Sequence, residues 1–221
     1  MQYPGVVRAS FIDRPNRFIA HVRCGTETLT VHVKNTGRCR ELLLPGSEVY
    51  LTEPGTPGRK TRYDLIAVRK PGGLLVNIDS QAPNTVVREW LLTQSVQDLH
   101  PEYPFGESRL DFRFTHSGTD TLMEVKGCTL EREGIGYFPD APTERGVRHL
   151  HELIRAHREG FQAILVFVVQ MDGITVVRPN LETHPAFGEA LDAARMAGVR
   201  ILVLPCHIEP DSITPLPFLS L

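Results

Sequence analysis

Apolar and polar residues alternate over short segments throughout the first 80 residues of the chain. Turn-forming residues such as Pro15-Asn16, Gly25 and Pro45-Gly46 separate these segments. Alternation with a period of two is typical of β-strands that bury one face. The pattern predicts six short strands, over residues 6–12, 18–23, 28–33, 47–52, 64–69 and 74–78. Strands at this spacing favour a small closed or partly closed barrel, for which the OB type is the natural candidate.

The pattern changes at Pro83-Asn84, after which segments with helical spacing alternate with apolar runs. Asn84 is a favourable N-cap and predicts a helix from Thr85 to about residue 99. Leu150, Leu153, Ile154 and His157 form the predicted buried stripe of a second helix, which Gly160 ends. The other expected elements are strands over 109–114, 122–127, 162–170 and 200–204, a hairpin from 162–170 to 174–178 through Asp172-Gly173, and a helix over 185–197.

This order of elements predicts an α+β protein of two domains. The OB-like barrel is expected over residues 1–82, and a mixed α/β domain over residues 83–221. No stretch approaches the roughly 20 apolar residues that a membrane helix needs, and the first residues lack the features of a signal peptide. The four cysteines are scattered, with no C-x-x-C pair. We therefore expect a cytoplasmic protein without a membrane partner, a zinc site or a disulfide framework.

Charge is unevenly distributed along the chain. Residues 1–80 contain twelve Lys/Arg and seven Asp/Glu, a net charge of +5, whereas residues 81–221 carry −7. Basic side chains that neutralise phosphates are the main source of non-specific affinity for nucleic acids. The asymmetry therefore favours a nucleic-acid-binding first module, with chance surface variation as the alternative. The candidate contacts in one polar, basic loop are Lys34, Asn35, Arg38 and Arg40.

Two neighbouring strands carry residues with a definite chemistry. On the first, alternation places Leu110, Phe112 and Phe114 on one face and Asp111 on the other. On the second, Glu124 and Lys126 share a face. If the strands pair, the two carboxylates lie side by side, which is costly unless a cation such as Mg²⁺ sits between them. Lys126 can then stabilise the charge of a reacting phosphate or orient a water. A solvated sheet face is the alternative interpretation of the same residues.

The chain resembles the sugar fermentation stimulation protein A family along nearly its whole length. The matching blocks are Pro4-Gly5, Asn35-Thr-Gly-Arg38, Arg40-Glu-Leu42, Leu44-Pro-Gly46, Pro83-Asn84, Gly106-x-Ser-Arg-x-Asp-Phe112, Glu124-Val-Lys126, Thr129-Leu130, Phe138-Pro-Asp-Ala-x-Thr-x-Arg-Gly146 and His149-Leu150. The resemblance implies an OB-like barrel followed by a domain of the PD-(D/E)xK nuclease-like fold, DNA binding, and a role in sugar (maltose) utilisation. The nuclease-type residues carry over onto Asp111, Glu124 and Lys126. Gly127-Cys128 departs from the pattern, because relatives usually have a polar or small residue followed by Val.

Several further residues are candidates for this site. Glu89, on the first predicted helix, or Glu102, just before Gly106, is expected to complete the metal shell. Asp140, in the irregular loop after Phe138, is a third candidate. Helical spacing puts Arg145 and His149 on one face, where they either bind a phosphate or face solvent.

We expect a DNA-binding protein with a site for Mg²⁺ or Mn²⁺ that hydrolyses phosphodiesters. A non-catalytic DNA-binding regulator of sugar metabolism is the alternative. RNA remains an alternative ligand, and a homodimer an alternative to a monomer.

Overall fold

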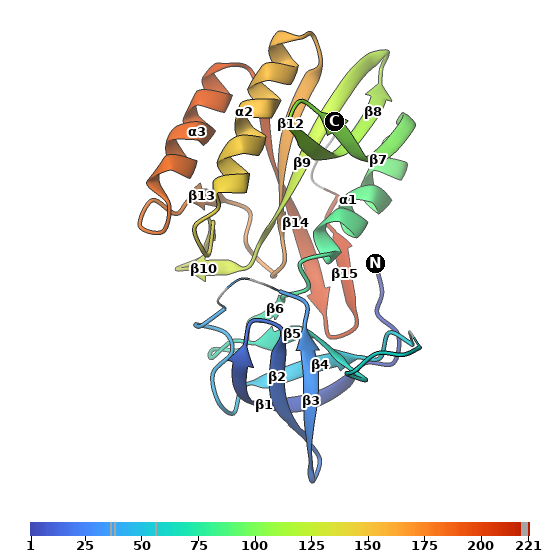
Figure 1. Cartoon of the computed structure of the whole chain (residues 1–221), viewed down its shortest axis with the longest axis vertical. Coiled ribbons are helices and arrows are strands. Elements are labelled where there is room, and N and C mark those ends of the chain that lie inside the picture. The colour runs from blue at the N-terminus through green and yellow to red at the C-terminus, as the bar shows by residue number, and fades with distance from the viewer. Residues whose placement is uncertain (36, 38, 56, 218–220) are drawn as a thin grey trace.

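The computed structural model describes residues 1–35, 37, 39–55, 57–217 and 221. A β-barrel lies at one end of the long axis, and a larger layered sandwich of helices and strands lies at the other (Figure 1). No helix in these described ranges is long and apolar enough to cross a membrane.

The first six strands form the barrel. They are β1 (Val7–Asn16), β2 (Ile19–Cys24), β3 (Glu27–Val33), β4 (Glu48–Thr52), β5 (Asp64–Arg69) and β6 (Leu75–Asn77). Strands β1 to β5 close the barrel in the order β1-β2-β3-β5-β4, because β3 pairs with β5 in parallel and β4 returns to β1. The predicted small closed barrel is confirmed.

A six-stranded sheet organises the second part of the chain, with the order β15-β14-β12-β9-β8-β7. A three-stranded sheet, β10-β11-β13, lies beside it. The helices are α1 (Ala82–Leu92), α2 (Glu144–Arg158) and α3 (Pro185–Met196); the strands are β7 (Gln97–Phe105), β8 (Ser108–His116), β9 (Thr119–Cys128), β10 (Leu130–Arg132), β11 (Ile135–Phe138), β12 (Gln162–Val169), β13 (Val177–Pro179), β14 (Arg200–Glu209) and β15 (Ser212–Pro215). The expected mixed α/β region is confirmed.

Helices cover both faces of the larger sheet (Figure 1). The central strand β12 shows this most clearly, because its side chains alternate between two apolar clusters. Leu165 and Phe167 belong to the cluster that contains the buried residues of α2 and α3. Val166 and Val168 belong to the cluster that contains the buried residues of α1. Because β12 is buried on both faces, its sequence from Ala163 to Val169 is continuously apolar.

Buried polar groups join the barrel to the sandwich. The side-chain amide of Gln170 donates to Oδ1 of Asn77 at 2.9 Å and to the carbonyl of Asp79 at 3.0 Å. The backbone N–H of Asn77 returns a bond to the carbonyl of Gln170 at 2.9 Å. At the periphery Lys70 pairs with Glu131 at 2.6 Å. Because these groups satisfy one another away from water, they fix how the two parts meet.

The predicted helix over residues 85–99 is wrong at both ends. Helix α1 begins at Ala82, and Pro83 fits its first turn because that turn needs no backbone N–H donor there. The helix ends at Leu92, and β7 follows, a strand that the sequence did not predict. This strand contains Pro101 and Pro104, which are tolerated because β7 lies at the edge of the sheet.

The predicted hairpin through Asp172-Gly173 is also wrong. A turn does form there, but the following strand, β13, pairs in parallel with β11. β12 cannot accept the returning strand, because β9 and β14 already occupy both of its edges. Asp172 is held to β14 instead, through Nδ1 of His207 at 2.9 Å. The last predicted strand is longer than expected and is followed by β15.

Candidate functional site

Asp111 on β8 accepts hydrogen bonds on both carboxylate oxygens. Oδ1 accepts from the side-chain amide of Asn84 at 2.8 Å, and Oδ2 accepts from the backbone N–H of Val125 at 2.7 Å. Burial raises the pKa of Asp111 to about 6, and the negative charge of Glu124 adds to the effect. The Val125 N–H and the charge of Lys126 offset only part of this rise. The carboxylate would therefore be stabilised by a cation beside it.

Glu124 on β9 is 2% exposed, and its two oxygens have different surroundings. Oε1 contacts both Nζ of Lys126 and Nδ1 of His149. Oε2 is buried and has no hydrogen-bond partner among the residues that the structure describes. Burial by itself raises the pKa of Glu124, but the charge of Lys126 and the bond from His149 outweigh it, so the pKa lies below its usual value. Glu124 is thus an ionised carboxylate with one satisfied and one unsatisfied oxygen.

Asp111 and Glu124, called the acid pair below, meet where the pairing of β8 and β9 ends. Regular pairing reaches Phe112 opposite Met123, and the acid pair occupies the next position on each strand. The predicted alternation breaks at the same point. Leu110 packs in the cluster of α2 and α3, whereas Phe112 and Phe114 pack in the cluster of α1.

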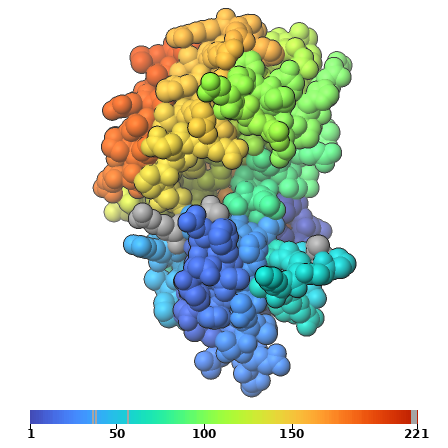
Figure 2. All heavy atoms as spheres, viewed as in Figure 1, coloured from blue at the N-terminus to red at the C-terminus, as the bar shows by residue number. Residues whose placement is uncertain are grey.

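Two helices bring further side chains to the acid pair. Asn84 comes from the first turn of α1, and His149 comes from the second turn of α2. Both helices begin on the side of the sheet that faces the barrel (Figure 1). The molecular surface recedes between them, just above the barrel loops (Figure 2). The candidate site therefore lies at the junction of the two parts of the chain.

His149 does not lie on the surface, as its predicted contact with nucleic acid would require. It is 3% exposed, and besides contacting Glu124 it accepts a bond at Nε2 from Nε of Arg145 at 3.2 Å. Arg145 itself is exposed, so its guanidinium is accessible to a phosphate. Farther along the same face, Glu152 accepts the backbone N–H of Glu107 at 3.2 Å. This face of α2 is directed at β8 and β9, and only its first turn reaches solvent.

The structure does not bring Glu89 or Glu102 to the acid pair. Oε2 of Glu89 lies 2.6 Å from the backbone amine of Met1, and the residue is about 140° around α1 from Asn84, at roughly 100° per residue. Glu102 is exposed on the edge strand β7 and pairs with Arg109 at 3.3 Å. Each of these acids pairs with a different basic group, and neither lies beside Asp111 and Glu124.

Two of the proposed loop residues hold the barrel junction together. Nζ of Lys34 pairs with the fully buried carboxylate of Asp79 at 2.8 Å. The side chain of Asn35 accepts the N–H of Gly37 at 2.7 Å and donates to the carbonyl of Ile78 at 2.9 Å. These bonds give Lys34 and Asn35 a structural role at the junction, and their contact with nucleic acid stays a prediction.

Arg38 lies outside the described residues, and Arg40 is exposed. The loop approaches the second part of the chain at Gly37, where a Cβ atom would lie 2.2 Å from Oδ2 of Asp140. Since Asp140 lies four residues before the start of α2, the loop lies near the N-terminal end of the helix that carries Arg145. Of the basic side chains predicted to contact nucleic acid, Arg40 and Arg145 are exposed in the described part of the chain.

The departure at Gly127-Cys128 has a steric explanation. A Cβ on residue 127 would lie 2.3 Å from Oε1 of Gln170 and 2.9 Å from Cγ of Pro83. Glycine therefore lets β9 pass close to both the start of α1 and the amide that joins the barrel. Cys128 is buried, and burial raises the pKa of its thiol to about 12, so it is not a nucleophile.

The acid pair fits a hard divalent cation. In the described part of the chain, no three His, Cys, Asp or Glu side chains gather into a metal cluster. The pair would therefore supply two carboxylates, and water and phosphate oxygens would supply the remaining ligands, as is common for Mg²⁺. The unsatisfied Oε2 of Glu124 and the raised pKa of Asp111 are the two observations that favour positive charge at this position.

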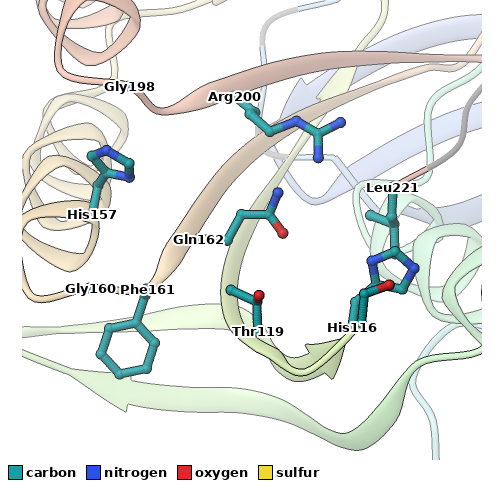
Figure 3. A pocket seen from close by; sticks show the side chains of 10 residues that line it. His116, Thr119, His157, Gly160, Phe161, Gln162, Gly198, Arg200 and Leu221 are labelled. Carbon is teal, nitrogen blue, oxygen red and sulfur yellow. The ribbon is translucent and has the colours of Figure 1, made fainter.

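A pocket of about 530 Å³ lies at the end of the large sheet that is farther from the acid pair, and Figure 3 shows the side chains that line it. Its lining includes His116, His157, Gln162 and Arg200, from the ends of four different elements. Helices α2 and α3 both end there, and their terminal carbonyls favour neighbouring basic side chains. We therefore explain these basic residues by the helix ends and do not assign them to the site.

Sequence reasoning found the acid pair and Lys126 but missed two of their partners. Asn84 was expected to cap a helix, and its side chain instead bonds to Asp111. His149 lies four residues before the stripe residue Leu153, a spacing that puts both on the buried face of α2. His157, which the predicted stripe also included, is exposed.

Comparison with known proteins identifies the two parts of the chain. A family model described as "SfsA N-terminal OB domain" matches residues 12–78. A second family model, "Sugar fermentation stimulation protein RE domain", matches residues 81–212.

Relatives match almost the entire chain. A "Sugar fermentation stimulation protein homolog" from Desulfitobacterium hafniense is 50% identical over 216 residues, which cover 96% of this chain and 94% of the relative. A homolog from Clostridium beijerinckii is 45% identical and covers 96% of each chain. The solved structure of Pyrococcus furiosus SfsA in complex with Ca²⁺ superimposes with a TM-score of 0.87 at 30% identity, covering 97% of this chain and 95% of that one. The chain therefore belongs to the sugar fermentation stimulation protein (SfsA) family.

Proposed function

We propose that the protein binds DNA and holds a divalent cation at the acid pair, in a site that hydrolyses phosphodiesters. The observation that carries this proposal is the buried Oε2 of Glu124, which has no partner among the described residues and lies beside the partly buried carboxylate of Asp111. Carboxylates in this state are stabilised by a cation. The Ca²⁺ complex of the Pyrococcus furiosus relative supports a metal site in the family.

The residues around the acid pair suit phosphodiester hydrolysis. Bound Mg²⁺ or Mn²⁺ would polarise the phosphate and lower the pKa of a coordinated water. Lys126 keeps its ammonium group at the acid pair, where it can neutralise charge that develops on the phosphate. To do so, Lys126 must exchange its contact with Glu124 for a phosphate oxygen. Asn84 and Val125 meanwhile keep Asp111 in place through their bonds to its two oxygens.

The DNA contacts are proposed at the junction between the barrel and the sandwich. Arg40 and Arg145 are exposed on either side of it, and the first 80 residues carry a net charge of +5. Guanidinium groups bind phosphates through paired N–H donors, so the two arginines can hold a strand across the recessed surface.

Cleavage assays test the catalytic part of the proposal. The purified protein is incubated with single- and double-stranded DNA and RNA in Mg²⁺ or Mn²⁺, beside the double variant Asp111→Ala, Glu124→Ala. We expect cleavage that requires the metal and disappears in the variant. Cleavage no faster than that of the variant on every substrate would refute hydrolysis.

The alternative is a DNA-binding regulator of sugar metabolism that does not cleave. The family description, sugar fermentation stimulation, favours a regulatory role. The acid pair would then hold a cation for binding or stability only. A protein that binds DNA with a steep salt dependence and lacks metal-dependent cleavage would fit this alternative.

A further inference from the structure

The two oxygens of Glu124 differ in a way that assigns a role to His149. Oε1 is contacted by Lys126 and His149, whereas Oε2 has no partner in the described part of the chain. A buried carboxylate oxygen without a donor is costly, so Oε2 calls for a water or a cation. The side chain is held so that its unsatisfied oxygen is the one left to bind a ligand.

Arg145 determines which nitrogen of His149 carries hydrogen. Nε of Arg145 donates to Nε2 of the ring at 3.2 Å, so Nε2 is the acceptor. In a neutral imidazole the other nitrogen then carries the hydrogen. Nδ1 therefore donates to Oε1 of Glu124. Nζ of Lys126 also lies 3.4 Å from Nδ1, but an ammonium cannot accept a hydrogen bond, and Lys126 donates to the same Oε1. The ring is thus fixed at both nitrogens, with a donor aimed at the carboxylate.

Helix α2 holds the ring rigidly in this position. The side chain of Thr143 caps the helix by accepting the N–H of Gly146 at 3.0 Å. Leu150 and Leu153 are fully buried in the cluster between α2, α3 and the sheet. His149 is itself 3% exposed, so it has little freedom to turn away from Glu124. Lys126 also contacts Oε1, but its longer aliphatic side chain can turn toward a phosphate, whereas the ring cannot follow.

We propose that His149 is a positioning residue that holds Oε1 of Glu124 and thereby presents Oε2 to the divalent cation. Arg145 selects the ring tautomer that makes this possible. The inference rests on the proposed metal site, and it explains how Glu124 stays oriented when Lys126 moves to a phosphate. Residues that orient metal ligands in this way typically change metal affinity by about 10–100-fold when they are replaced.

Isothermal titration with Ca²⁺ alone tests this role without any reaction. His149→Ala removes the donor, whereas His149→Asn keeps an amide N–H near the position of Nδ1. We expect His149→Ala to weaken Ca²⁺ binding on the order of 10–100-fold, and His149→Asn to recover most of the loss. Arg145→Met should weaken binding in the same direction but less. His151→Ala, an exposed position on the same helix, is the matched control and should bind as the wild type does.

Thermal unfolding in EDTA separates positioning from general stability. If Ca²⁺ affinity follows the unfolding temperature of the variants and not the presence of a donor at residue 149, the positioning role is refuted. Wild-type affinity in His149→Ala refutes it directly, and wild-type affinity in Arg145→Met refutes the role of the tautomer. A wild-type protein that binds no Ca²⁺ would instead refute the proposed metal site, and the inference with it.

Discussion

Oδ2 of Asp111 accepts the backbone N–H of Val125 at 2.7 Å, where a strand carbonyl would otherwise act as the acceptor. The backbone pairing of β8 and β9 ends at Phe112 and Met123, and the side chain of Asp111 links the two strands at the next position of β8. This bond holds Asp111 beside Glu124 before any cation arrives. Burial raises the pKa of the partly buried Asp111, and the negative charge of the neighbouring Glu124 raises it further.

The metal-free protein should therefore be stabilised by Asp111→Asn above neutral pH. Folding raises the pKa of Asp111 from 3.8 to about 6, so the protonated form favours the folded state. That contribution is full below the lower value and is lost as the pH rises through the higher one. Relative to the variant, the wild type should lose about 1–1.5 kcal/mol of unfolding free energy between about pH 5 and about pH 8.

Urea unfolding in EDTA measures this difference. Asp120→Asn is the control on β9. Arg113 lowers the pKa of Asp120, so the difference in unfolding free energy between this variant and the wild type should change with pH in the opposite direction. If Asp111→Asn changes the unfolding free energy equally at the lower and the higher pH, the raised pKa of Asp111 is contradicted.

Lys126→Met should abolish most of the catalysis and leave DNA binding intact. The ammonium of Lys126 contacts the acid pair and does not lie on the exposed surface. Loss of a group that stabilises developing charge typically costs about 10²–10³-fold in rate. Single-turnover cleavage and DNA affinity in Ca²⁺ measure the two effects separately. An unchanged cleavage rate would exclude Lys126 from the reaction.

Arg40→Ala and Arg145→Ala should each weaken DNA binding and reduce its salt dependence. Each removes a single exposed guanidinium, so the slope of log affinity against log salt should fall by about 1 per substitution. Arg200→Ala, in the pocket at the far end of the sheet, is the control and should leave the slope unchanged. A slope that responds to Arg200 and not to the other two would place the DNA elsewhere.

Lys34→Met should destabilise the fold and leave the salt slope unaltered. Lys34 pairs with Asp79, which is 0% exposed, so the substitution leaves a buried carboxylate without its cation. Breaking such a pair costs about 3–5 kcal/mol, and the remaining bonds from Tyr3 and Gln81 to Asp79 should reduce the loss. Urea unfolding checks the loss. A variant of normal stability with a reduced slope would contradict this and support the predicted contact of Lys34 with nucleic acid.

The local patterns in the sequence predicted the barrel and the two strands of the acid pair. Period-two alternation is a local property, and Glu124 and Lys126 lie two residues apart on one strand. Strand β7 was not predictable in the same way. Pro101 argues against a strand unless the strand lies at the edge of a sheet, and the sequence alone does not show that β7 is an edge strand. The parallel pairing of β13 depends on β12 having no free edge, which is a property of the whole sheet.

The partners of the acid pair were harder to predict than the acids themselves. The stripe at Leu150 and Leu153 indicates which face of α2 is buried. It does not say that Glu124 lies opposite His149, because the two residues are 25 positions apart. Asn84 has the same difficulty, since its bond to Asp111 spans 27 positions. Contacts of this kind follow from how the helices pack on the sheet.

The location of a bound cation tests the central claim most directly. Crystals of the wild-type protein grown or soaked with Mn²⁺ would show the ion by its anomalous scattering. We predict a single strong peak within about 2.0–2.6 Å of Oε2 of Glu124 and of a carboxylate oxygen of Asp111, absent in Glu124→Gln. A cation bound only elsewhere, or a peak that Glu124→Gln leaves in place, would contradict the account.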